Sequence, residues 1–127
     1  MSRSKHQVES PWARHYQDVW HERSGDHNLP KWLRVTCLAY GAHQNNGHAN
    51  FKRGEVALVL ATIDTETGAI YPLDRRDVFR AIRQAVAFGW LEEGSTARCL
   101  IVPAHAVKKG PLGDETKPCP IHVRRGR

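Results

Sequence analysis

The sequence predicts a mainly α-helical domain closed by a small β-hairpin. Apolar residues recur at intervals of three and four after Asn28 and again after Asp74, which is typical of amphipathic helices. The segment "WLEEGSTARCLIV" places a Gly-Ser-Thr turn between two short runs, which indicates a hairpin. With 127 residues, the chain suits one domain, residues 29–103, between an N-terminal segment, 1–28, and a C-terminal extension, 104–127.

The N-terminal segment contains "SPWARHYQDVWHER", an expected helix. Ser10 is a candidate N-cap, and Pro11 suits the first turn because its missing N–H leaves no helical hydrogen bond unmade. The side chains of Trp12, Tyr16 and Trp20 share one face at helical spacing. We expect this face to pack on the domain. The alternative is a surface for dimerisation or for another protein.

The segment "NLPKWLRVTCLAYGAH" is the expected core helix, with Asn28 as its N-cap. Its predicted apolar face consists of Leu29, Trp32, Leu33, Thr36, Cys37 and Tyr40. Cys37 is therefore expected to be a buried, unreactive thiol. "HANFK" predicts a short strand and "RGEVALVLAT" a short buried helix, and "DTETGAIYPLD" predicts a loop in which Ala69 to Tyr71 can extend.

The next helix, "DRRDVFRAIRQAVAFG", is expected to be capped by Asp74 and to end at Gly89 in a left-handed conformation. Its predicted core face consists of Val78, Phe79, Ile82, Ala85, Val86 and Gly89. The opposite face carries Arg76, Arg80 and Arg83, with Gln84 beside them. This second face is either the solvated side of the helix or a binding surface.

The formal charge of +6 favours an anionic partner, although the excess is uneven. Residues 31–107 hold nine Lys and Arg against seven Asp and Glu, whereas residues 108–127 hold six against two. No apolar run approaches the roughly 20 residues that cross a bilayer, and the N-terminus lacks the apolar core of a secretion signal. A cytoplasmic protein without a membrane partner is expected, with its three cysteines reduced or metal-bound.

The order of these elements resembles the winged helix-turn-helix domain. Residues 29–103 carry the resemblance through "GEVALVL", "DRRDVFRAIRQAVAFGWL" and the wing "EEGSTARCLIV", and the chain is similar to small helix-turn-helix proteins of actinobacterial phages and plasmids. In that family the helix before the wing enters the major groove of DNA. The resemblance implies a DNA-facing set of Arg75, Arg76, Arg80, Arg83 and Gln84, with Arg98 on the wing.

The expected function is sequence-specific binding of double-stranded DNA by a small phage or bacterial transcriptional regulator. Arginine can bind guanine O6 and N7 together, and glutamine can pair with adenine. Lys108, Lys109, Arg124 and Arg125 are expected to contact phosphates. One short recognition helix reads few base pairs, which favours a homodimer on paired half-sites. The alternatives are a replication-initiation or partition protein, and a protein-interaction module that uses the winged helix as a scaffold.

A second pattern points to one structural zinc ion. Cys99, His105, Cys119 and His122 form a C-x5-H-x13-C-x2-H array of thiol and imidazole groups, which suit tetrahedral zinc. His43 or His48 is an alternative to Cys99 as the fourth ligand, and Cys99 on a strand is also compatible with a plain core cysteine. We expect no catalytic activity, because the chain shows neither a coherent motif with paired acids nor a phosphate-binding glycine loop.

Overall fold

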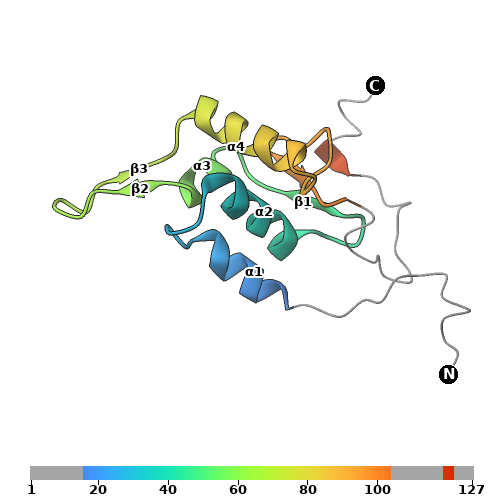
Figure 1. Ribbon diagram of the computed structural model, residues 1–127, viewed down its shortest axis with the longest axis horizontal. Helices are drawn as coiled ribbons and strands as arrows, with labels where there is room; N and C mark the ends of the chain where they lie inside the picture. The colour runs from blue at the N-terminus through green and yellow to red at the C-terminus, as the bar shows by residue number, and fades with distance from the viewer. Residues whose placement is uncertain (1–15, 104–118, 122–127) are drawn as a thin grey trace, which may run out of the picture.

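The computed structural model describes residues 16–103 and 119–121, and it is helical with two small antiparallel sheets (Figure 1). The elements follow the order α1 (Gln17–Ser24), α2 (Lys31–Ala42), β1 (His48–Asn50), α3 (Glu55–Val59), β2 (Thr62–Ile63), β3 (Ile70–Tyr71), α4 (Arg75–Ala87) and β4 (Cys99–Ile101). The predicted class, mainly α with a small β part, is thus confirmed. None of the described helices is long and apolar enough to cross a membrane.

Helix α2 is the centre of the core and lies between α1 and α4 (Figure 1). Its most buried apolar residues are Val35, Leu38 and Ala39, each at most 1% exposed. They pack with Leu60 after α3, Ile82 of α4 and other buried residues in one apolar cluster. The predicted apolar face of α2 was therefore too narrow, because neighbours cover this helix on more than one side.

Helix α1 packs on α2 through close backbone contact and an aromatic pair. A β-carbon added at Gly41 would lie 2.8 Å from the His21 nitrogen, so glycine is needed for this approach. The ring centroids of Trp20 and Tyr40 lie 5.2 Å apart. Trp20 thus packs on the domain as expected, whereas Tyr16 is 81% exposed. Trp12 and the expected N-cap of this helix, Ser10, lie outside the described residues.

Arg34 joins three helices from a buried position that the sequence did not predict. Its side chain on α2 is 2% exposed, and Nε donates to the Ser24 carbonyl at 2.8 Å. A terminal nitrogen donates to the Val59 carbonyl at 2.9 Å. Burial lowers the pKa of this guanidinium, and the nearby Asp26 carboxylate opposes that shift. Arg34 therefore satisfies two helix-end carbonyls that water cannot reach easily.

Helix α4 begins and ends where the sequence predicted. The Asp74 carboxylate accepts a hydrogen bond from the Arg76 backbone N–H at 3.3 Å, and Gly89 has φ of +85°. Its buried residues are Val78, Ala81, Ile82 and Ala85. Phe79 was placed in the core by sequence and this was wrong: its side chain is 64% exposed, because the buried face is turned toward Ala81.

Strand β4 pairs with β1, in a register that sets Asn50 opposite Cys99 and His48 opposite Ile101. Successive side chains of β4 point to opposite sides. Leu100 enters the main core, while Cys99 and Ile101 join a second cluster with Cys119 and Ile121. The sequence expected a first hairpin strand in "WLEE". That expectation was wrong, because the structure assigns no strand to residues 90–93. Their one backbone hydrogen bond to β4 among the described residues runs from the Glu92 N–H to the Ile101 carbonyl, at 2.9 Å.

The segment before α4, expected as a loop, folds into a hairpin formed by β2 and β3, which projects from the helices (Figure 1). The Asp64 carboxylate accepts from the Glu66 N–H at 2.8 Å, and this bond and a second one from Thr67 lower its pKa. Ile70 and Tyr71 did extend as expected. Both are more than half exposed, because no described element covers the hairpin.

Candidate metal centre and nucleic-acid interface

Three thiol and imidazole groups converge on the outer side of the β1–β4 sheet. The Nδ1 atom of His48 lies 3.3 Å from Sγ of Cys99, which lies 3.5 Å from Sγ of Cys119. One ligand atom from each of the three residues lies within 4.8 Å of the other two. The group can hold a metal ion.

The strand register explains why these residues meet. His48 and Asn50 of β1 face the same side of the sheet as Cys99 and Ile101 of β4, since paired residues share a face. Cys119 is brought against this face, where the Asn50 amide donates to its sulfur at 3.4 Å. Both cysteines are buried and His48 is half-buried. The site is thus largely shielded from solvent, and His48 is its most exposed member.

Two of the three distances between ligand atoms are close to those that zinc imposes, and the third, between His48 and Cys119, is within 4.8 Å. Bond lengths of about 2.3 Å to sulfur and 2.05 Å to nitrogen, at tetrahedral angles, set ligand atoms about 3.8 Å apart for two sulfurs and about 3.6 Å apart for sulfur and nitrogen. The observed 3.5 Å and 3.3 Å differ from these values by only a few tenths of an ångström. Burial and the adjacent Cys119 thiol raise the pKa of Cys99, and the hydrogen bond from Asn50 opposes this shift.

The sequence-predicted ligand set is thus partly assembled. Cys99 and Cys119 come together, and His48 joins Cys99, whereas the sequence analysis considered it a replacement. His43 lies elsewhere, with Nδ1 2.9 Å from the Gln44 carbonyl oxygen. His105 and His122 lie outside the described residues. Cys37 is buried on α2, as expected, and burial raises its pKa.

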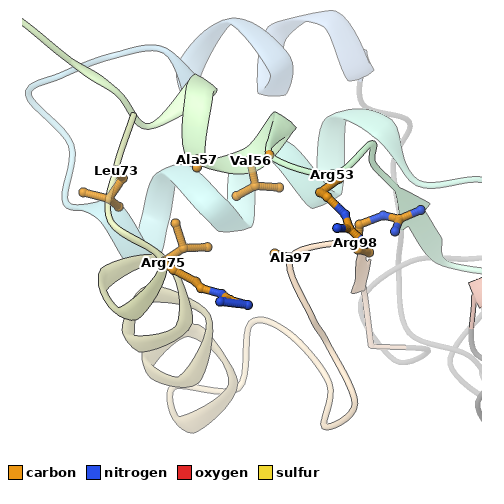
Figure 2. Close-up of a pocket in the computed structure, with 9 residues that line it drawn as sticks. Arg53, Val56, Ala57, Leu73, Arg75, Ala97 and Arg98 are labelled. Carbon is orange, nitrogen blue, oxygen red and sulfur yellow. The ribbon is translucent and has the colours of Figure 1, made fainter. Parts of the chain in front are cut away.

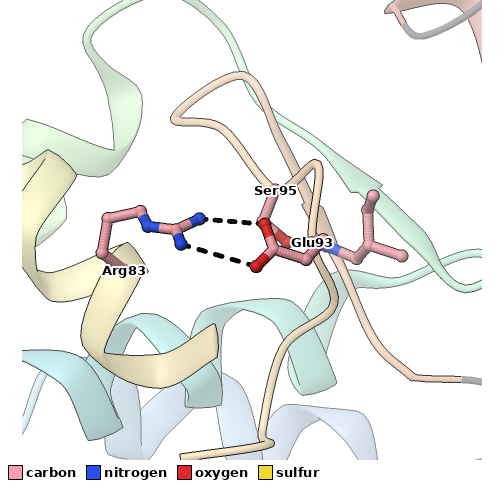
Figure 3. A network of polar contacts seen from close by, with 4 residues as sticks. Arg83, Glu93 and Ser95 are labelled. Carbon is pink, nitrogen blue, oxygen red and sulfur yellow. Dashed lines mark hydrogen bonds and ion pairs between the residues drawn. The ribbon is translucent and has the colours of Figure 1, made fainter. Parts of the chain in front are cut away.

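The second candidate site is the outer face of α4. The five residues that the sequence assigned to DNA on this helix are all exposed: Arg75, Arg76, Arg80, Arg83 and Gln84. Two of them hold acidic partners. Arg80 bonds to Asp77 at 2.9 Å within the helix, and Arg83 bonds to Glu93 at 3.1 and 3.4 Å. Figure 3 shows the second pair bridging α4 and the loop after it.

The loop between α4 and β4 holds Glu93 in place. The Ser95 N–H donates to the Glu92 carbonyl at 3.2 Å, and the Ser95 hydroxyl accepts from the Ile101 N–H at 2.9 Å. Arg83 lowers the pKa of the exposed Glu93 carboxyl through hydrogen bonding and charge, and desolvation opposes this shift. One of the arginines that the sequence assigned to DNA therefore neutralises an acidic side chain in the loop after α4.

The remaining predicted contacts divide into two groups. Arg98 lies just before β4 on the exposed surface, and its Nε donates to the Phe51 carbonyl at 2.9 Å. This bond orients the guanidinium and leaves its terminal nitrogens for other partners. Lys108, Lys109, Arg124 and Arg125 lie outside the described residues.

In comparisons with known proteins, no family model, no curated protein and no solved structure matched the chain.

Proposed function

We propose that the protein binds double-stranded DNA as a winged helix-turn-helix protein, with α4 as the recognition helix. One observation carries the proposal: α4 presents a row of exposed arginines in a chain where α2, β1, α3, α4 and β4 follow the helix, strand, helix, helix and strand order of a winged helix. The described residues depart from that order in two places, because the β2–β3 hairpin lies between α3 and α4 and a single strand, β4, follows α4. The pairing of β1 with β4 supports it, because it holds the segment after α4 against the same core as α2. A small phage or bacterial transcriptional regulator is the expected class.

The charge pairs divide the arginines by role. Arg76 and Arg80 lie on the outer face of α4, where a planar guanidinium can reach base edges in the major groove. Arg80 would exchange its exposed partner Asp77 for DNA at little cost, because exposed ion pairs within one helix turn are weak. Arg83 instead holds the loop through Glu93 in the free protein. We therefore assign base contacts to Arg76, Arg80 and Gln84, and positioning of the wing to Arg83.

Selection of bound sequences from random duplex DNA at near-physiological salt tests the proposal most directly. A shared motif is expected, and two copies at a fixed spacing would indicate the homodimer. Binding without any sequence preference would contradict a role for α4 in reading bases, and absence of binding would contradict the function itself. Arg76→Ala is expected to lose the motif, whereas Arg23→Ala on α1 is the matched control for loss of one exposed arginine.

The same assay separates the alternatives. Phosphate contacts make log K fall with log salt by about 0.9 for each neutralised phosphate, whereas an aromatic protein interface is far less sensitive to salt. For a replication-initiation or partition protein, log K for DNA would fall equally steeply with log salt, but the selected site would come from a replication origin or a partition locus. A protein-interaction module would show neither the motif nor the slope.

We also propose that His48, Cys99 and Cys119 bind one structural zinc ion. The support is the donor set, two thiols and one imidazole, and its distances. His105 and His122 are the predicted sources of a fourth ligand. The ion would add a bond between residues 119–121 and the β1–β4 sheet to the apolar contacts that Cys119 and Ile121 make with Cys99 and Ile101.

Metal analysis of the full chain, purified under reducing conditions without chelator, tests this assignment. About one zinc ion per chain is expected, and cobalt substituted for zinc should give the absorption of a tetrahedral site with thiolate ligands. Cys99→Ala, Cys119→Ala and His48→Ala should each lose the ion, while Cys37→Ala should retain it. Zinc content well below one ion per chain, unchanged by these variants, would show that the cluster is a plain buried thiol pair.

A further inference from the structure

A hollow with a basic rim lies between the start of α3, the start of α4 and the segment that enters β4. Its volume is about 500 Å³. Three arginines line it, one from each region: Arg53, Arg75 and Arg98 (Figure 2). The remaining lining is Gly54, Val56, Ala57, Leu73, Val78 and Ala97, so the wall is apolar and holds no carboxylate.

The positive charge of this hollow is not neutralised by the residues that the structure describes. No acidic partner of Arg53 or Arg75 is found among them, unlike Arg80 and Arg83. Arg98 is oriented by its bond to the Phe51 carbonyl, which does not consume charge. Apolar walls reduce the screening of such charges by water, so an anion in the hollow would be attracted more strongly than on an open surface.

The hollow opens beside the proposed recognition face. Arg75 lines it and also lines a second hollow with Asp74, Arg76 and Phe79, so the first turn of α4 separates the two. A convex helix can enter a DNA groove, whereas a concave basic surface can receive the protruding backbone at the groove's edge. Arg53 was not among the predicted DNA-binding residues, since it precedes the short helix α3 and not α4.

We propose that this hollow binds one backbone phosphate of the DNA duplex, held by Arg53, Arg75 and Arg98. The proposal rests on the proposed DNA binding, and it adds a contact that fixes the position of α4 in the groove without reading sequence. Its chemistry is charge and hydrogen bonding to phosphate oxygens, which any sequence offers. Loss of the contact should therefore weaken binding to all duplexes alike.

The test is the salt dependence of duplex binding by the full chain. Arg53→Ala should lower the slope of log K against log salt by about 0.9 and leave the selected motif unchanged. Arg53→Lys should restore most of the slope, since a phosphate accepts a point charge. Arg23→Ala, an exposed arginine on α1, is the control and should behave as wild type. Ala97→Glu places a carboxylate at the hollow and should weaken binding more than Arg53→Ala.

The outcomes are distinguishable. If wild type binds duplex DNA and both Arg53→Ala and Ala97→Glu match it in slope, the phosphate site is refuted while DNA binding stands. If wild type binds no duplex, both proposals fail. Saturable binding of inorganic pyrophosphate that Arg53→Ala abolishes, with an unchanged duplex slope, would assign the hollow to a free phosphorylated ligand and overturn the backbone assignment. A circular dichroism spectrum like that of wild type is required of each variant.

Discussion

If α4 faces DNA as proposed, the ion pair between α4 and the following loop predicts a variant that binds DNA more tightly than wild type. Glu93→Gln removes the carboxylate that holds Arg83 at 3.1 and 3.4 Å. The Glu93 side chain is 75% exposed and that of Arg83 is 47% exposed, so the substitution should not disturb packing. It removes one negative charge beside the proposed DNA surface and frees one arginine on it.

The expected gain follows from counting charges. Freed Arg83 can neutralise one further phosphate, which raises the slope of log K against log salt by about 0.9. Over a fourfold change in salt concentration, this adds a factor of about 3.5 to the change in affinity. Arg83→Ala should weaken DNA binding in the wild-type background, because it leaves the Glu93 carboxylate without its partner beside the proposed DNA surface. In the Glu93→Gln background the same substitution should remove the whole gain.

Fluorescence anisotropy of a labelled duplex, titrated at several salt concentrations, measures both quantities. Glu92→Gln is the matched control, because it removes the same charge from the neighbouring residue but does not release Arg83. If both glutamine variants gain affinity equally, general charge explains the effect and the specific role of the pair is wrong. If neither variant gains affinity, the loop does not face DNA.

Three further predictions concern the helices and the same ion pair. Arg34→Met should cost roughly 2–5 kcal/mol in urea denaturation, because two buried carbonyls lose their charged donor; a cost below about 1 kcal/mol would contradict the buried position. Phe79→Ala should change the free energy of unfolding by less than about 1 kcal/mol, whereas Ile82→Ala should lower it by about 2–5 kcal/mol. A larger loss for Phe79→Ala than for Ile82→Ala would mean that Phe79 lies in the core, as the sequence predicted. Arg83 lowers the pKa of Glu93, so the ion pair should persist as pH falls through the usual glutamate range and should break only at the lowered pKa. NMR titration of the Arg83→Ala variant should show an ordinary glutamate pKa for Glu93.

The features that the sequence predicted well depend on neighbouring residues. The Asp74 cap and the Gly89 terminator act within one turn of α4, so their residue types are sufficient signals. The Phe79 error was one of rotation. At about 100° per residue, the predicted face is centred near Ile82, roughly 60° from Phe79, whereas the residues that α2 and α3 bury are centred near Val78 and Ala85, roughly 110° from Phe79.

The features that the sequence missed depend on distant pairing. His48 could be named as a ligand only in competition with Cys99, because the two are 51 positions apart and only the β1–β4 register shows that they face one side together. Arg34 is an arginine in a helix, which normally indicates a solvated position. Its burial depends on α1 and α3 both ending beside α2, and no local pattern encodes that.

The two sides of β4 imply that a metal bound by His48, Cys99 and Cys119 would contribute to stability separately from the core. Leu100 packs into the main cluster with α2 and α4, whereas Cys99 belongs to the small cluster that holds Cys119. Because the main cluster does not include the ligands, the helices should stay folded when the metal is removed. Chelator treatment should leave the helical circular dichroism and a cooperative unfolding transition in place.

The same treatment should alter the NMR signals of residues 119–121 and of His48, while slow amide exchange persists in α2 and α4. The matched variant, Cys119→Ala, should reproduce these changes without chelator, and Cys37→Ala should not. Collapse of helical structure on chelation would mean that metal binding drives folding of the whole domain, as in small zinc fingers. That result would contradict the separation of the two clusters. It would also make loss of DNA binding by metal-free protein uninformative about direct contacts, so this control must precede any DNA assay of the ligand variants.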